Sequence, residues 1–184
     1  MSESFTRLAH KFRKIEKLVQ LSEEPLSCWI EALKIAKDNS PALKAAPIHH
    51  DIVIVTVQLR RIFAKYPVPR DITFWWFGLF DVQEPDGSEG AGFCLGSGRG
   101  DDGAGQLSAG ATSVYPAGDH DLLDSEVLAL VQAQKVVKPE EYEKFDYLVT
   151  FAAAAVIAKF ASLACDLTPP VFVGFNSGDF GRVL

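Results

Sequence analysis

Apolar residues are most concentrated between residues 71 and 82, where they occupy both faces of an extended segment. At a period of two, one face carries Ile72, Phe74, Trp76, Phe80 and Val82, and the other carries Trp75, Phe77 and Leu79. A strand with a solvent face would alternate apolar and polar residues. The pattern therefore predicts a central strand at 72–82, with a helix or a second layer on each face.

Two amphipathic helices are predicted before this strand. From Ser4 to about Gln20, apolar residues recur at helical spacing, and lysines and arginines lie mostly on the opposite face. The second helix begins after Ser22, which we interpret as its N-cap, with Glu23 and Glu24 in the first turn. The segment from Asp38 to Pro41 ends it.

The segment from 48 to 66 sends two conflicting signals. Its β-branched run from Ile52 to Val57 favours a strand locally. Apolar residues nevertheless continue at a spacing of three and four over its whole length, without a turn signal, and this predicts a buried helix. His49 and His50 are adjacent and would point about 100° apart, so we interpret this stretch as a helix start capped by Asp51.

Glycine dominates the region between Pro85 and Gly118, which contains ten of the 14 glycines. Such a density favours turns, bulges and loops. Two short strands are still predicted, one around Phe93–Leu95 and one from Leu107 to Tyr115, pairing antiparallel with 72–82. The tip from Gly96 to Gly105 is expected to be exposed.

The C-terminal part predicts two helices and a strand pair. One helix starts at Asp121 or Asp124, and a longer one starts at Pro139 and reaches about Cys165. Residues 148–164 approach the length of a membrane span, but Lys159 and many small residues favour a buried helix. The chain is thus predicted to be a single α+β domain, helical at 1–66 and 121–165, sheet-forming at 71–115, with a strand pair at 171–184. The sheet is expected to be antiparallel or mixed, with four to five strands.

Charge is divided unevenly along the chain. Residues 1–70 contain 12 Lys/Arg and 7 Asp/Glu, whereas residues 71–184 contain 6 and 17. The segment 81–126 has one base, Arg99, and ten acids: Asp81, Glu84, Asp86, Glu89, Asp101, Asp102, Asp119, Asp121, Asp124 and Glu126. A surface of this kind repels phosphates and favours a cationic partner or a metal ion.

Motifs for catalysis, cofactors and metals are weak. Gly98–Gly103 has the spelling of the dinucleotide fingerprint, but no amphipathic helix follows and two aspartates would face the phosphates. Cys28, Cys94 and Cys165 are far apart and suggest buried thiols rather than a disulfide framework or zinc site. The N-terminal stretch has no apolar run typical of a signal peptide, so we expect a cytoplasmic protein. No cofactor, metal or membrane partner is expected. A nucleic-acid partner is not expected either, because the bases of the first helix resemble an ordinary solvated face.

Two main functional hypotheses follow, and a structural subunit of a larger assembly is a third. The first is a small intracellular protein that binds a basic partner, such as a toxin, as an inhibitor or immunity-type protein; the weakness of the catalytic motifs favours this binding role over an enzyme without deciding between them. Its candidate contacts are Glu84, Asp86, Glu89, Asp101, Asp102, Asp119 and Asp121. The alternative is an enzyme or small-ligand protein that uses His120 between Asp119 and Asp121 as an acid/base group or metal ligand.

Overall fold

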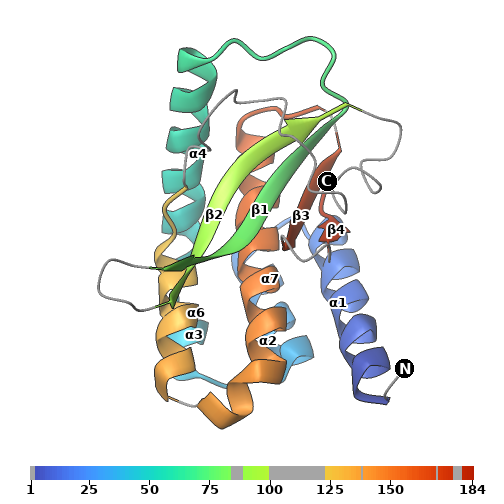
Figure 1. Ribbon diagram of the computed structural model, residues 1–184, viewed down its shortest axis with the longest axis vertical. Helices are drawn as coiled ribbons and strands as arrows, with labels where there is room; N and C mark the ends of the chain where they lie inside the picture. The colour runs from blue at the N-terminus through green and yellow to red at the C-terminus, as the bar shows by residue number, and fades with distance from the viewer. Residues whose placement is uncertain (1–2, 84–88, 100–122, 138, 169, 176–179) are drawn as a thin grey trace.

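The computed structural model of the chain describes residues 3–83, 89–99, 123–137, 139–168, 170–175 and 180–184 (Figure 1). Within these residues there are six helices and four strands. The helices are α1 (Glu3–Leu21), α2 (Pro25–Ala36), α3 (Pro41–Lys44), α4 (Ile48–Lys65), α6 (Glu126–Val137) and α7 (Pro139–Ala164). The strands are β1 (Phe74–Gln83), β2 (Glu89–Gly98), β3 (Val171–Phe175) and β4 (Phe180–Arg182). The predicted single α+β domain is confirmed.

The four strands form one mixed sheet in the order β2-β1-β3-β4. β1 pairs antiparallel with β2 and parallel with β3, and β4 returns antiparallel to β3. The aromatic strand therefore has a hydrogen-bonded neighbour on each side, as its two apolar faces predict. The strand pair predicted at 171–184 is confirmed, and the helix over 48–65 is confirmed as α4.

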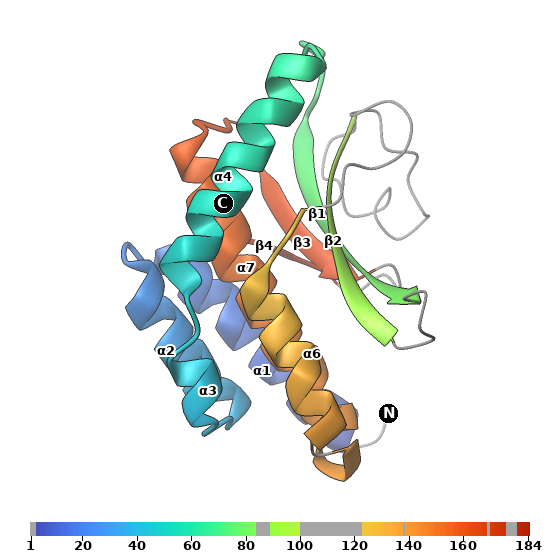
Figure 2. The ribbon, with the colours of Figure 1, turned by 90° about the vertical axis from the view of Figure 1, so that its left-hand side faces the viewer.

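All the described helices pack on one face of the sheet (Figure 2). Trp75, Phe77 and Leu79 of β1 point into the main core with α7, whose residues Leu148–Ala158 are buried. The opposite face carries a smaller cluster, in which Phe74 and Phe172 are buried and Trp76 and Phe180 are partly buried. Of the two covering layers that the sequence predicts, the structure describes the helical one.

The glycines at the end of β2 are part of the sheet, not of a loop. Gly96, Ser97 and Gly98 are strand residues and are buried, so the prediction that the exposed tip begins at Gly96 is wrong. Gly98 is paired with Phe74, and a Cβ atom on Gly98 would lie 2.1 Å from that ring. Glycine is needed here because the aromatic ring occupies the space of a side chain. The second strand predicted at 107–115 lies outside the described residues.

The start of α2 differs from the prediction by two residues. Glu24, not Ser22, is the N-cap, and its carboxylate accepts hydrogen bonds from the N–H groups of Leu26 and Ser27. The Ser22 hydroxyl instead donates to the carbonyl of Leu18 and so belongs to the end of α1. α6 similarly begins at Glu126, after the positions predicted for its start.

α7 is the core helix of the molecule. Among the described residues, its stretch Tyr147–Ala164 is the one that is long and apolar enough to cross a membrane, yet 78% of it is buried inside the molecule. α1, α2, α4 and α6 all contact it, as do β1 and β3 (Figure 1). The small residues Ala152–Ala155 are fully buried, which allows close approach of these neighbours. The burial agrees with the interpretation of this helix as a core element.

Side chains from α1 cover the outer edge of β4. The carboxylate of Glu16 accepts a hydrogen bond from the N–H of Arg182 at 2.8 Å, and Gln20 donates to the carbonyl of Arg182 at 2.7 Å. Unpaired N–H and C=O groups at a sheet edge invite pairing with another chain. These two side chains satisfy the backbone of Arg182 and hold α1 against the sheet.

Candidate functional site

Most of the acidic residues predicted to bind a partner lie outside the described residues. These are Glu84, Asp86, Asp101, Asp102, Asp119 and Asp121, and the same holds for His120 of the alternative site. Glu89 is described only at its backbone, as the first residue of β2, opposite Gln83. The structure therefore gives no geometry for the predicted Asp119–His120–Asp121 arrangement.

Two charged side chains of the acidic segment, Arg99 and Asp124, are described together with their partners. Arg99 forms an ion pair with Asp71, with Nε 2.6 Å from one carboxylate oxygen and a second nitrogen 3.1 Å from the other. The one base of segment 81–126 is thus bound to a carboxylate from outside that segment. Asp124 exchanges two hydrogen bonds with the side-chain amide of Gln58 at 2.6 and 3.1 Å.

Three consecutive residues of α4 connect it to two other helices. His49 lies 3.4 Å from Glu24 of α2, and His50 lies 3.7 Å from Glu126 of α6; both pairs are exposed. Asp51 is fully buried and accepts hydrogen bonds from the N–H groups of Glu126 and Val127 and from the Ser125 hydroxyl. The prediction that Asp51 caps its own helix is wrong, because α4 already begins at Ile48 and Asp51 caps α6 instead.

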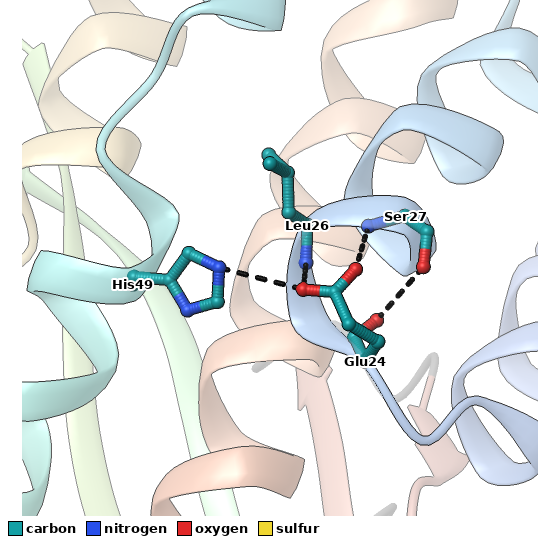
Figure 3. Close-up of polar contacts among 4 residues, drawn as sticks. All are labelled: Glu24, Leu26, Ser27 and His49. Carbon is teal, nitrogen blue, oxygen red and sulfur yellow. Dashed lines mark hydrogen bonds and ion pairs between the residues drawn. The ribbon is translucent and has the colours of Figure 1, made fainter.

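The N-cap of α2 is a second polar junction (Figure 3). Glu24 Oε2 accepts from the N–H of Ser27 at 2.6 Å, and Oε1 accepts from that of Leu26 at 3.0 Å and faces His49. Hydrogen bonds from the Ser27 and Leu26 backbones, in that order of weight, lower the pKa of Glu24 from 4.5 to about 2. The junction therefore needs the ionised carboxylate.

Replacing Glu24 with glutamine is expected to lower the thermal unfolding midpoint in a pH-dependent way. A carboxyl group whose folded pKa is depressed stabilises the fold above its ordinary pKa of 4.5, and this contribution is lost as the pH falls through about 2. The difference between wild type and Glu24→Gln, followed by circular dichroism, should be full at pH 6 and vanish near pH 2. Glu31→Gln, at an exposed acid of the same helix, is the control. If Glu24→Gln lowered the thermal midpoint equally at both pH values, the ionised carboxylate would not be what stabilises the N-cap of α2.

The described cysteines are poorly suited to nucleophilic or metal chemistry. Burial raises the pKa of Cys94 to about 11, and it also raises the pKa values of Cys28 and Cys165. A thiol with a raised pKa holds little thiolate at neutral pH. Within the described ranges, no group of three or more His, Cys, Asp or Glu residues is placed to hold a metal ion.

Sequence reasoning missed a groove between α1, α7 and β4, with a volume of about 350 Å³. It is lined by Leu8, Ala9, Phe12, Arg13, Glu16, Tyr147 and Phe180. Five of these residues belong to the first helix, where Arg13 matched the pattern of a solvated basic face. No local sequence pattern predicts that these α1 residues lie beside Tyr147 and Phe180, because those two residues are more than 130 positions away in the chain.

Comparison with protein-family models, with curated proteins and with solved structures finds no match for this chain.

Proposed function

We propose that this protein is an intracellular binding protein that attaches to a basic protein partner through its acidic segment, residues 81–126. The observation that carries the proposal is the charge of that segment. It has ten acids and one base, and that base, Arg99, is ion-paired with Asp71. Among the described residues, the ion-pair partner of this base is therefore a carboxylate from outside the segment.

A concrete form of this function is inhibition. A cationic enzyme such as a nuclease toxin presents a positive surface for phosphates, and a dense set of carboxylates can cover that surface. Complementary charge of this kind accelerates association and makes it strongly dependent on ionic strength. An immunity-type protein that must capture its toxin quickly would gain from this property.

The proposal is tested by immobilising the protein, capturing partners from its own cells at low salt, and identifying them by mass spectrometry. A captured basic protein is then purified, and its association rate is measured across ionic strength. The screening length falls from about 10 Å at 0.1 M salt to about 3 Å at 1 M. We expect the association rate to fall steeply over this range.

A matched pair of variants locates the contact. Asp101→Asn, Asp102→Asn and Asp121→Asn together remove three negative charges from the segment, and Glu23→Gln, Glu31→Gln and Asp166→Asn remove three from exposed positions elsewhere. The first variant should associate at least tenfold more slowly than wild type, and the second should remain close to it. Retention of no basic protein at low salt, or equal losses in both variants, would refute the proposal.

A further inference from the structure

The groove between α1, α7 and β4 has an aromatic floor whose rings are already held in place. The Phe12 ring stacks on Phe151 at a centroid distance of 3.9 Å, and the Tyr147 ring stacks on Phe175 at 4.2 Å. Phe180 packs edge-on against Phe172 at 6.0 Å. Phe12, Tyr147 and Phe180 are only half-buried, so part of each ring is open. Binding against such rings costs little additional ordering.

The rim of the groove holds two opposite charges. Glu16 is fixed by the N–H of Arg182, which donates to Oε1. Gly181 leaves room for this carboxylate, since a Cβ there would lie 3.3 Å from Glu16 Cδ. Arg13 is exposed one turn earlier on α1. Among the described residues, neither side chain forms an ion pair, so the guanidinium and the second carboxylate oxygen can both receive a ligand.

We propose that this groove binds a free aromatic α-amino acid. A carboxylate would pair with Arg13, an ammonium group with Glu16, and a planar side chain would pack on the ring of Phe12 or Phe180. Glu16 would repel a simple anion, and Arg13 would repel a simple cation. A zwitterion therefore fits the two charges best. The volume of about 350 Å³ lies at the small end of ligand pockets. The residues that line the groove all lie outside segment 81–126 in the sequence.

The probe is L-phenylalanine, titrated into the isotope-labelled full-length protein and followed by backbone amide chemical shifts. We expect saturable shifts at Arg182 and along α1 between Leu8 and Glu16. Three analogues each remove one feature: L-phenylalaninamide lacks the carboxylate, 3-phenylpropionate lacks the ammonium group, and L-alanine lacks the ring. Each analogue should bind about tenfold more weakly or worse, because each leaves one part of the groove without its partner.

Variants separate the rim charges from the rest of the surface. Arg13→Gln and Glu16→Gln should each weaken L-phenylalanine binding about tenfold. Glu16→Gln retains a carbonyl oxygen that can accept from the N–H of Arg182, so the edge of β4 stays covered. Lys14→Gln removes the same charge as Arg13→Gln from the next, exposed position of α1 and should bind like wild type. Unchanged thermal midpoints would show that the variants fold.

Several outcomes would overturn the proposal. One is the absence of saturable shifts up to the solubility limit of L-phenylalanine, and another is equal affinity in wild type and Arg13→Gln. Binding of 3-phenylpropionate as tight as that of L-phenylalanine would also overturn it, because the ammonium group would then play no part. Shifts confined to residues outside the groove would do the same.

Discussion

Replacing Asp51 with alanine is expected to lower the free energy of unfolding by about 3 kcal/mol. The side chain is fully buried, and its carboxylate accepts from Ser125 Oγ, from Glu126 N at 3.1 Å and from Val127 N at 2.9 Å. Truncation leaves two N–H groups at the start of α6 without this acceptor and removes the junction between α4 and α6. Urea unfolding, followed by tryptophan fluorescence, measures the change.

The neighbouring residue provides the control for Asp51. His50 is exposed and lies 3.7 Å from Glu126, a geometry whose contribution to stability is at most about 1 kcal/mol. His50→Ala should therefore stay close to wild type. A double-mutant cycle between Asp51→Ala and Ser125→Ala should show coupling, because the two side chains share one hydrogen bond. An Asp51→Ala protein as stable as His50→Ala would show that α6 does not depend on this cap.

The elements that sequence predicted best are those with a sustained hydrophobic period. The aromatic run around Trp75 and Phe77 has no polar side facing solvent, and this places β1 between two strands. In α4 the β-branched run favours a strand over six residues, but burial of one helical face over 18 residues outweighs it. In both cases the deciding signal is a face made mostly of apolar residues, and the spacing of these residues in the sequence shows that face directly.

The functions of individual polar residues were harder to predict, because their partners are distant in sequence. Asp51 resembles a local N-cap, yet the groups it binds are more than 70 residues away. His49 and His50 do point in different directions, as expected for adjacent helical residues, since His49 faces Glu24 and His50 faces Glu126. Nothing in the local sequence indicates that Glu24 and Glu126 would be the residues they meet.

The pairing of the strands was also only partly predictable from the sequence. The apolar run Val171–Phe175 predicts a strand and a return to 180–184, but not that β3 lies parallel to β1. That arrangement requires the connection between β2 and β3, which contains α6 and α7, to cross over one face of the sheet. The groove follows from the same topology, since it forms only when β4 and α7 are brought beside α1.

Lys159 shows how a charge can be accommodated inside the helical layer. Its side chain is only 4% exposed, and Nζ donates to the carbonyls of Val19 at 2.6 Å, Gln20 at 3.0 Å and Ser22. These carbonyls lie at the C-terminal end of α1, where the helix leaves its last acceptors unpaired and carries a partial negative charge. In the sequence, Lys159 only interrupted an apolar run; in the fold it caps α1 from α7.

Replacing Lys159 with methionine is expected to lower the free energy of unfolding by about 2 kcal/mol, because the carbonyls at the end of α1 lose their donor. The loss is smaller than three full hydrogen bonds for two reasons. The Val19 carbonyl keeps the N–H of Ser22 as a partner, and burial, which lowers the pKa of Lys159 from 10.5, is a cost that methionine avoids. Urea unfolding measures the change, with Lys17→Met on the exposed side of α1 as the control. Hydrogen exchange should also quicken selectively in the last turn of α1, and unchanged stability together with unchanged exchange would show that the cap is dispensable.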